Sequence, residues 1–227
     1  MSRWFALLLG AAAVAGCSAL PESAAQRRQT AASPGPARTV AVARSPEAGQ
    51  CLARLGQTGA QYSALPDRYV DQGCAIVGTV QLASLASDRS QLGVSNLGPV
   101  TCEVSQAFTG WARYGVDRAA RQILGSPVRS IETMGSYSCR NVAGSGRRSA
   151  HATGEAIDIA GFVLEDGRRI VVKTGWSDGS SAEREFLRVV HQSACKRFDT
   201  VLGPDYNSAH SDHLHLEGVI ASKSYCR

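Results

Sequence analysis

Apolar side chains recur along the chain at spacings that predict helices in three segments. The clearest helix covers residues 102–124, and Gly125 and Pro127 are expected to end it. Its apolar positions follow one another at three- and four-residue steps: Val104, Phe108, Trp111, Ala112, Ala119 and Ile123. A second helix is predicted over residues 182–198 and a shorter one over residues 47–55. These helices have an apolar face that a sheet or another helix must cover.

Short β-prone runs between the helices predict strands. They cover residues 60–65, 74–77, 79–82, 128–134, 157–164, 169–173, 200–203 and 212–219. The segment 84–99 is polar and contains glycine, which predicts a loop. Helices alternate with hairpin-like strand pairs and not with repeated βαβ units. The pattern therefore predicts an α+β fold, with a small antiparallel or mixed sheet flanked by helices.

The N-terminal segment is typical of an exported protein. Arg3 precedes an apolar run of about a dozen residues, which is too short for a membrane span and suits a signal-peptide core. The run ends in Val14-Ala-Gly-Cys17, which resembles a bacterial lipobox. This resemblance implies a signal peptide over residues 1–16 and a lipid anchor on Cys17. A plain secretory signal with an incidental cysteine is the alternative.

The resemblance also implies a location in the cell envelope. The residue after the cysteine is Ser18 and not aspartate, which in Gram-negative lipoproteins favours the outer membrane, so we expect a lipoprotein that faces the periplasm. Residues 17–48 are rich in Ala, Ser, Pro, Arg and Gln without apolar periodicity, and predict a disordered tether. The folded domain is then expected over residues 49–227. A net charge of +5 without a dense Lys/Arg run argues against nucleic-acid binding.

The cysteine count fits an oxidising compartment. Removing Cys17 from the seven cysteines leaves an even number: Cys51, Cys74, Cys102, Cys139, Cys195 and Cys226. An even number in an exported chain predicts three disulfides, which would stabilise the domain. Roughly fifteen pairings are possible, and the sequence does not choose among them. A cysteine-rich zinc cluster is the competing interpretation, but the chain has no Cys-x-x-Cys pair.

Four of the five histidines gather in two places, residues 149–158 and 210–215. Neutral imidazole and carboxylate are zinc ligands, and a catalytic zinc needs three protein ligands and an open position. On the predicted last strand, alternation puts His213 and His215 on one face with Glu217, while the leucines between them face the core. We therefore expect the two stretches to meet in a zinc site at one edge of the sheet. His191 lies on the predicted second helix and is expected to be structural.

The first stretch matches the pattern Ser-x-His-x-x-Gly-x-Ala-x-Asp. The matching residues are Ser149, His151, Gly154, Ala156 and Asp158. This pattern resembles that of the zinc peptidases related to D-alanyl-D-alanine carboxypeptidases, the penicillin-insensitive murein endopeptidase and the hedgehog signalling domain. Residues 51–227 also resemble the bacterial extensin-like C-terminal domain family. That likeness rests on Gly135-Ser-Tyr-Ser-Cys-Arg140-Asn, the stretch from His151 to Phe162, Val201-Leu-Gly-Pro-Asp-Tyr-Asn207, His210-x-x-His-x-His215 and Cys226-Arg.

The resemblance to the zinc peptidases implies a role for each matched residue. His151, Asp158 and His215 would hold Zn²⁺. In the carboxypeptidase branch a glutamate serves as general base at the place of Asp212, which here is one methylene shorter. Strand alternation also turns Asp212 away from the metal face, so His213 is the better candidate for the base, as in the endopeptidase branch.

Three further residues are expected around the metal. Arg140 resembles an arginine that binds a substrate carboxylate or the developing oxyanion, with a surface salt bridge as the alternative. His210 and Asn207 are expected to line the substrate cleft. Tyr137 and Ser149 are expected to contribute packing.

Together these features predict a zinc-dependent peptidoglycan peptidase. It would hydrolyse D,D-amide bonds in stem peptides or their crosslinks, and the His-x-His pair favours an endopeptidase over a carboxypeptidase. Peptidoglycan is the expected partner because it is the amide polymer nearest to a tethered envelope lipoprotein. Two alternatives stay open: a non-catalytic wall-binding or structural envelope lipoprotein with a structural zinc, and a zinc hydrolase that acts on a different substrate.

Overall fold

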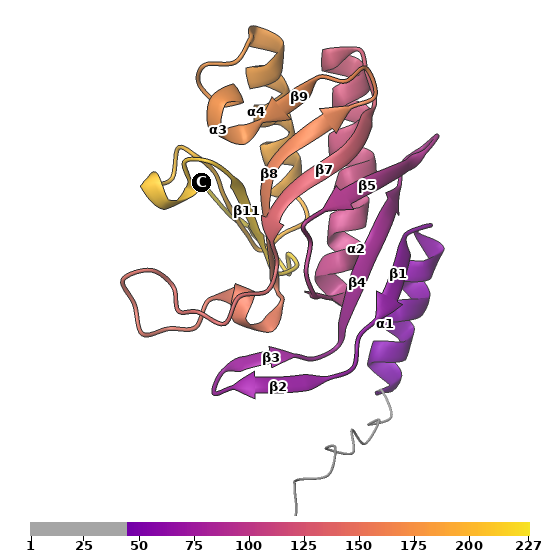
Figure 1. Cartoon of the computed structure of the whole chain (residues 1–227), viewed down its shortest axis with the longest axis vertical. Helices are drawn as coiled ribbons and strands as arrows, with labels where there is room; N and C mark the ends of the chain where they lie inside the picture. Colours follow the sequence, from indigo (N-terminus) through magenta and orange to yellow (C-terminus); the bar gives the residue numbers. More distant parts are fainter. Residues whose placement is uncertain (1–44) are drawn as a thin grey trace, which may run out of the picture. The chain divides into compact units, whose positions relative to one another are not determined.

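A ten-stranded mixed sheet runs through residues 45–227, which are the residues that the computed structural model describes (Figure 1). Its main path has the order β1-β4-β5-β7-β8-β11-β10-β12, with β6 paired to β4 and β9 to β8. The strands are β1 (Gln61–Ala64), β4 (Thr79–Ala86), β5 (Gln91–Ser95), β6 (Val100–Thr101), β7 (Val128–Gly135), β8 (Ala156–Leu164), β9 (Arg169–Val171), β10 (Thr200–Leu202), β11 (Leu214–Glu217) and β12 (Tyr225–Cys226). β5 pairs with β7, and β10 with β12, in parallel, whereas the other pairs are antiparallel. The mixed α+β prediction is confirmed.

The sheet is larger than the small sheet predicted. The prediction of a loop over residues 84–99 was wrong, because β4 continues to Ala86 and Gln91–Ser95 forms β5 beside β7. Leu85 and Leu92 are both fully buried and anchor these strands. Polar neighbours on the outer face obscure the apolar pattern from which a strand would be predicted. A separate hairpin, β2 (Arg68–Asp71) and β3 (Cys74–Ile76), projects beyond this sheet.

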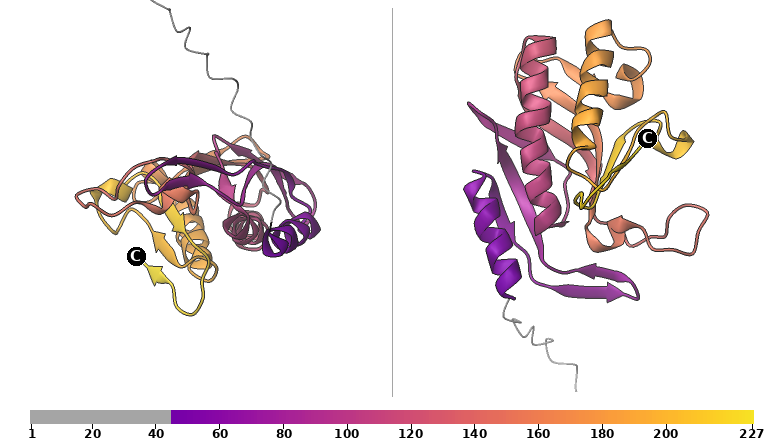
Figure 2. Two further views of the ribbon diagram at one scale, coloured as in Figure 1. Left: turned by 90° about the horizontal axis from the view of Figure 1, so that it is seen from below. Right: turned by 180° about the vertical axis from the view of Figure 1, so that it is seen from behind.

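Helices cover one face of the sheet (Figure 2). α1 (Pro46–Gln57) starts after the N-cap Ser45, so the last three residues of the predicted tether are already helical. α2 (Cys102–Trp111) continues through wider π-helical turns to Leu124, where Gly125 ends it in a left-handed conformation. α4 (Ser181–Ala194) starts with a capping box, and short α3 (Val172–Gly175) replaces the end of a predicted strand. In residues 45–227, no helix is long and apolar enough to span a membrane.

Aromatic side chains pack between these helices and the sheet. Trp111 of α2 lies against Phe108, Phe162 of β8 and Phe198, with ring centroids 5.9, 6.2 and 6.5 Å apart. The Trp111 Nε1–H donates to the Val190 carbonyl of α4 at 2.9 Å, so the buried indole has its polar partner. The helix-covered face is therefore the core, and the opposite face of β8 and β11 is left for polar side chains.

Three disulfides cross-link the domain, as predicted. Cys51–Cys102 joins α1 to α2, Cys74–Cys139 joins β3 to the segment after β7, and Cys195–Cys226 joins the end of α4 to β12. The signal peptide, the lipidation site Cys17 and nearly all of the predicted tether lie outside the described residues.

Candidate metal site and cleft

His151, Asp158 and His215 converge on the face of the sheet opposite the helices. Asp158 on β8 lies opposite His215 on β11 in the antiparallel register, and His151 comes from a 3₁₀ turn, Ala150–Thr153. The Asp158 Oδ1 lies 2.9 Å from the His215 Nδ1. The His151 Nε2 lies 3.2 Å from the Asp158 Oδ2 and 3.3 Å from the His215 Nδ1. All three residues are at most 9% exposed, so their side chains are shielded from solvent.

Neighbouring acceptors fix the tautomer of each histidine. The His151 Nδ1 lies 2.8 Å from the Ser136 carbonyl oxygen, which can only accept, so this nitrogen carries the proton. The His215 Nε2 lies 3.0 Å from the Glu217 carboxylate and donates to it. In the neutral rings, the His151 Nε2 and the His215 Nδ1 therefore hold lone pairs, and both point at the Asp158 carboxylate. Such outward hydrogen bonds are typical of histidines that bind metals.

The electrostatics of the site favour a positive charge between these groups. Burial acts to raise the pKa of Asp158, but its contacts with His151 and His215, in which a protonated ring donates, outweigh burial and lower the pKa. Burial acts to lower the pKa of His215, but hydrogen bonds to Asp158 and Glu217 outweigh it and raise the pKa to about 9. When neither ring carries an extra proton, three acceptor atoms face one another, and two imidazoles with one carboxylate are a ligand set that fits a Zn²⁺ ion.

The backbone around His151 explains the spacing of the sequence pattern. The Ser149 Oγ caps the 3₁₀ turn by accepting from the His151 N–H at 3.4 Å. Gly154 ends the turn with φ +71°, and a Cβ there would lie 2.9 Å from the Pro99 carbonyl oxygen. The chain then enters β8, which places Asp158 beside His151. Serine and glycine thus shape the turn, and Ser149 supports the histidine as expected of a packing residue.

His213 lies beside this group, just before β11 begins. Its Nε2 lies 3.5 Å from the Asp158 Oδ1, and its Nδ1 lies 2.9 Å from the Asp212 Oδ1. The predicted strand over residues 212–219 is thus too long, but His213 still projects on the face of His215. Asp212 contacts the far side of the His213 ring. A neutral His213 that donates to Asp212 presents the lone pair of its Nε2 to the site.

A cleft of about 600 Å³ opens beside the metal site and is lined by His210, His213 and His215. One wall is a short ribbon over residues 140–149, closed by a bridge between Asn141 and Arg148. Arg140 and Arg147 line the cleft. In residues 45–227 no ion pair engages the Arg140 guanidinium.

The ribbon is held from outside the cleft. The Arg148 guanidinium turns away and donates to the Gln72 carbonyl oxygen in the β2–β3 hairpin. The Cys74–Cys139 disulfide ties the same hairpin to the base of the ribbon. The two arginines that line the cleft therefore sit on an anchored segment.

His210 and Asn207 form part of the cleft lining. The His210 Nδ1 lies 2.7 Å from the Asn207 Oδ1, and the His210 ring lies 5.7 Å from that of His215, centroid to centroid. Burial, and then the nearby histidines, lower the pKa of His210 to about 4. His210 is therefore neutral at neutral pH.

The site differs from the sequence prediction in two respects. It does not lie at an edge of the sheet, because β10 and β12 extend the sheet beyond β11 and leave β8 and β11 inside it. The prediction also missed Glu217 as the partner of His215, although alternation along the strand puts both on one face. Ser136 was missed as well, because it acts through its backbone carbonyl and side-chain chemistry gives no signal for that contact.

A second group of potential ligands lies elsewhere. His191, Cys195 and Cys226 come within 4.8 Å of one another, but the two cysteines form a disulfide and offer no thiolate. The His191 ring packs edge-on against Trp176, and its Nε2 lies 3.1 Å from the Arg227 backbone oxygen. These contacts are those of a structural histidine.

Comparison with protein families identifies one match. The family described as "Extensin-like protein C-terminus" matches residues 49–227, the same range as the predicted domain. Comparison with curated proteins finds no match, and neither does comparison with solved structures. The family match covers most of the chain, and the protein therefore belongs to the extensin-like C-terminal domain family.

Proposed function

We propose that this protein is a zinc-dependent peptidoglycan peptidase that hydrolyses D,D-amide bonds in stem peptides or their crosslinks. One observation carries the proposal: three buried acceptor atoms, on His151, Asp158 and His215, face one another while the outward nitrogens of both rings are engaged. Without a metal, a proton on His215, whose pKa is raised to about 9, offsets the charge of the buried Asp158 carboxylate. A divalent ion would take the place of that proton and engage all three atoms.

Each residue then has a chemical task. His151, Asp158 and His215 would hold the zinc ion, which would act as a Lewis acid and lower the pKa of a bound water toward about 7. His213 is the general base, because its Nε2 faces the site and Asp212 fixes its ring by accepting from the Nδ1. Asp212 is thus a positioning residue. Arg140 lines the cleft without an ion-pair partner among residues 45–227, and its guanidinium would bind a substrate carboxylate or a developing oxyanion.

The substrate is proposed from the sequence pattern and the export signal. The pattern from Ser149 to Asp158 resembles peptidases that act on D-alanyl bonds, and the His-x-His pair favours the endopeptidase branch. A lipid anchor on Cys17 would place the domain in the periplasm beside peptidoglycan, with the outer membrane favoured. A peptide crosslink would enter the cleft of about 600 Å³ past Arg140.

A non-catalytic wall-binding or structural lipoprotein is the second candidate. One observation favours it: the His213 Nε2 lies only 3.5 Å from the Asp158 Oδ1. A small shift would make His213 a fourth protein ligand, and zinc sites closed by four protein ligands are usually structural.

Digestion of purified sacculi tests the proposal. The purified full-length protein and its His151→Ala variant are incubated with sacculi, and bound zinc and released muropeptides are measured. We expect one zinc per chain and loss of crosslinked dimers with the wild type only; trimmed monomers would instead identify a carboxypeptidase. Zinc binding with identical muropeptide profiles from both proteins would favour the structural module. A wild type that binds no zinc would refute the metal site.

A further inference from the structure

Two exposed tyrosines stand at the rim of the same cleft. Tyr206 and Tyr225 are 40% and 47% exposed, and both line the cleft with His213 and His215. Their ring centroids lie 6.2 Å apart and the ring planes meet at 88°, so the two rings form a corner. Large exposed aromatic side chains beside a cleft indicate a contact surface for a ligand.

The segments that carry these tyrosines are anchored although the rings are exposed. Tyr206 follows Asp205, which accepts from the Trp176 indole N–H at 2.9 Å and forms an ion pair with Arg188. The Tyr206 N–H donates to the Gly203 carbonyl at 2.9 Å. These contacts fix Tyr206 and the residue before it, which lowers the entropy cost that a ligand must overcome to bind.

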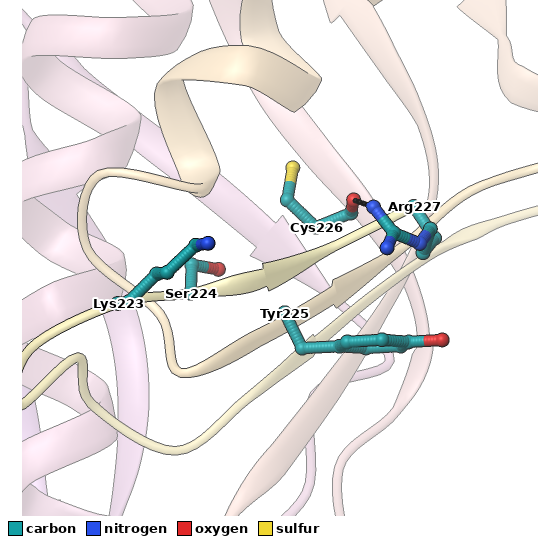
Figure 3. Close-up of a pocket in the computed structure, with 5 residues that line it drawn as sticks. All are labelled: Lys223, Ser224, Tyr225, Cys226 and Arg227. Atoms are coloured by element: carbon teal, nitrogen blue, oxygen red, sulfur yellow. Dashed lines mark hydrogen bonds between the residues drawn. The ribbon is translucent and has the colours of Figure 1, made fainter.

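Tyr225 is held in a comparable way on β12. Its N–H donates to the Asp199 carbonyl at 2.7 Å, and the next residue, Cys226, forms the disulfide to Cys195. Figure 3 shows the Tyr225 ring and the Cys226 sulfur on opposite sides of the strand. The disulfide therefore holds the strand from one side, and the ring lies partly exposed on the other. The Arg227 guanidinium lies 5.1 Å from the centre of the Tyr225 ring.

The corner is close to the proposed metal site. The Tyr206 ring lies 5.5 Å from that of His210, which in turn lies 5.7 Å from that of His215, centroid to centroid. A single ring thus separates the tyrosine corner from a metal-site residue. Tyr225 also lines an adjoining hollow of about 450 Å³ with residues 223–227, so the surface extends away from the histidines.

We propose that Tyr206 and Tyr225 form a saccharide-binding subsite, which takes an N-acetylhexosamine ring of the glycan to which the cleaved peptide is attached. A sugar ring has C–H faces that suit a flat aromatic side chain and hydroxyl edges that need polar partners. The corner offers both, because Asn207, Asp199 and Thr200 line the cleft around the two rings. This inference rests on the proposed function and extends it: the substrate is a glycan-linked peptide.

Binding of the N-acetylglucosamine tetramer to the full-length protein tests the subsite. Calorimetric titration is compared for the wild type, Tyr206→Ala, Tyr225→Ala and the control Tyr69→Ala. Tyr69 is 85% exposed on β2 and does not line the cleft. We expect the dissociation constant to rise about tenfold in each cleft variant and to stay within about twofold in the control. Tyr225→Phe keeps the ring and should stay close to the wild type.

Two results would overturn the subsite. One is a wild type that does not bind the tetramer. The other is a cleft variant that binds it like the wild type while thermal unfolding shows that both are folded. The tetramer carries no peptide, so its binding is independent of cleavage. Tetramer binding without sacculus digestion would refute the peptidase and support the sugar site. Sacculus digestion without tetramer binding would refute the sugar site and support the peptidase.

Discussion

Replacing Glu217 with glutamine isolates the contribution of the carboxylate behind His215. The Glu217 Oε2 accepts from the His215 Nε2 at 3.0 Å, which leaves the opposite ring nitrogen free to bind a metal. Glutamine keeps the length of the side chain and an oxygen acceptor but removes the negative charge. We expect the Glu217→Gln variant to fold normally and to bind zinc more weakly.

The size of the effect follows from the contact. A hydrogen bond to a charged partner contributes about 1.5–3 kcal/mol and a neutral one about 0.5–1.5 kcal/mol. The Glu217 side chain is 33% exposed, so solvent screens part of its charge, and we take only the difference between like ends of the two ranges. A difference of about 1–1.5 kcal/mol corresponds to a roughly tenfold rise in the dissociation constant for zinc. Losses of this order are typical of carboxylates that orient a ligating histidine.

Competition with a chromogenic chelator measures this constant. Glu185→Gln is the matched control, because Glu185 lies exposed on α4 and its substitution removes the same charge away from the site. The control should bind zinc like the wild type. If Glu217→Gln also bound zinc within about twofold of the wild type, Glu217 would have no part in holding His215 for a metal, and the tautomer argument would be wrong.

Three further predictions concern the turn, the base and the helix histidine. Gly154→Ala should lower the free energy of unfolding in urea by about 2–3 kcal/mol, because the new Cβ would lie 2.9 Å from the Pro99 carbonyl oxygen. The control Gly125→Ala has a similar φ of +72° but open space around the Cβ, and should lower it by about 1 kcal/mol. Equal losses in the two variants would contradict the role of Gly154 in the turn. His213→Gln should bind one zinc yet cut sacculi about 10²–10⁴-fold more slowly, and loss of the zinc would instead make His213 a ligand. Burial lowers the pKa of His191 below its usual 6.5, so the unfolded chain takes up a proton first as the pH falls. The free energy of unfolding should therefore fall from pH 7.5 to 5.5 and fall less in His191→Gln, and parallel pH profiles would refute this.

The sequence predicted those parts of the fold in which buried side chains set the pattern. The helix over residues 102–124 and the hairpin of β8 and β9 lie close to their expected bounds, because Phe108 and Phe162 face a common core. Gln91–Ser95 escaped prediction since only Leu92 of this strand is fully buried. Its strand character comes from pairing with β7, a contact between segments far apart in the chain.

In the candidate site, too, local sequence patterns predicted some features, and long-range contacts decided the others. Alternation along β11 placed His213 and His215 on one face, because Leu214 and Leu216 are fully buried on the other. The pairing of β11 with β8, which brings Asp158 opposite His215, is a long-range contact that no local pattern contains. The disulfide partners are 31 to 65 residues apart and were open for the same reason.

X-ray absorption at the zinc edge tests the central claim most directly. The zinc-loaded full-length protein should show nitrogen and oxygen neighbours at about 2.0–2.2 Å, with the multiple scattering of two imidazole rings and no sulfur. This is the ligand set of His151, Asp158 and His215. A sulfur shell near 2.3 Å would mean that a cysteine thiolate binds the metal and would contradict this ligand set. A protein that binds no zinc would contradict the metal site altogether.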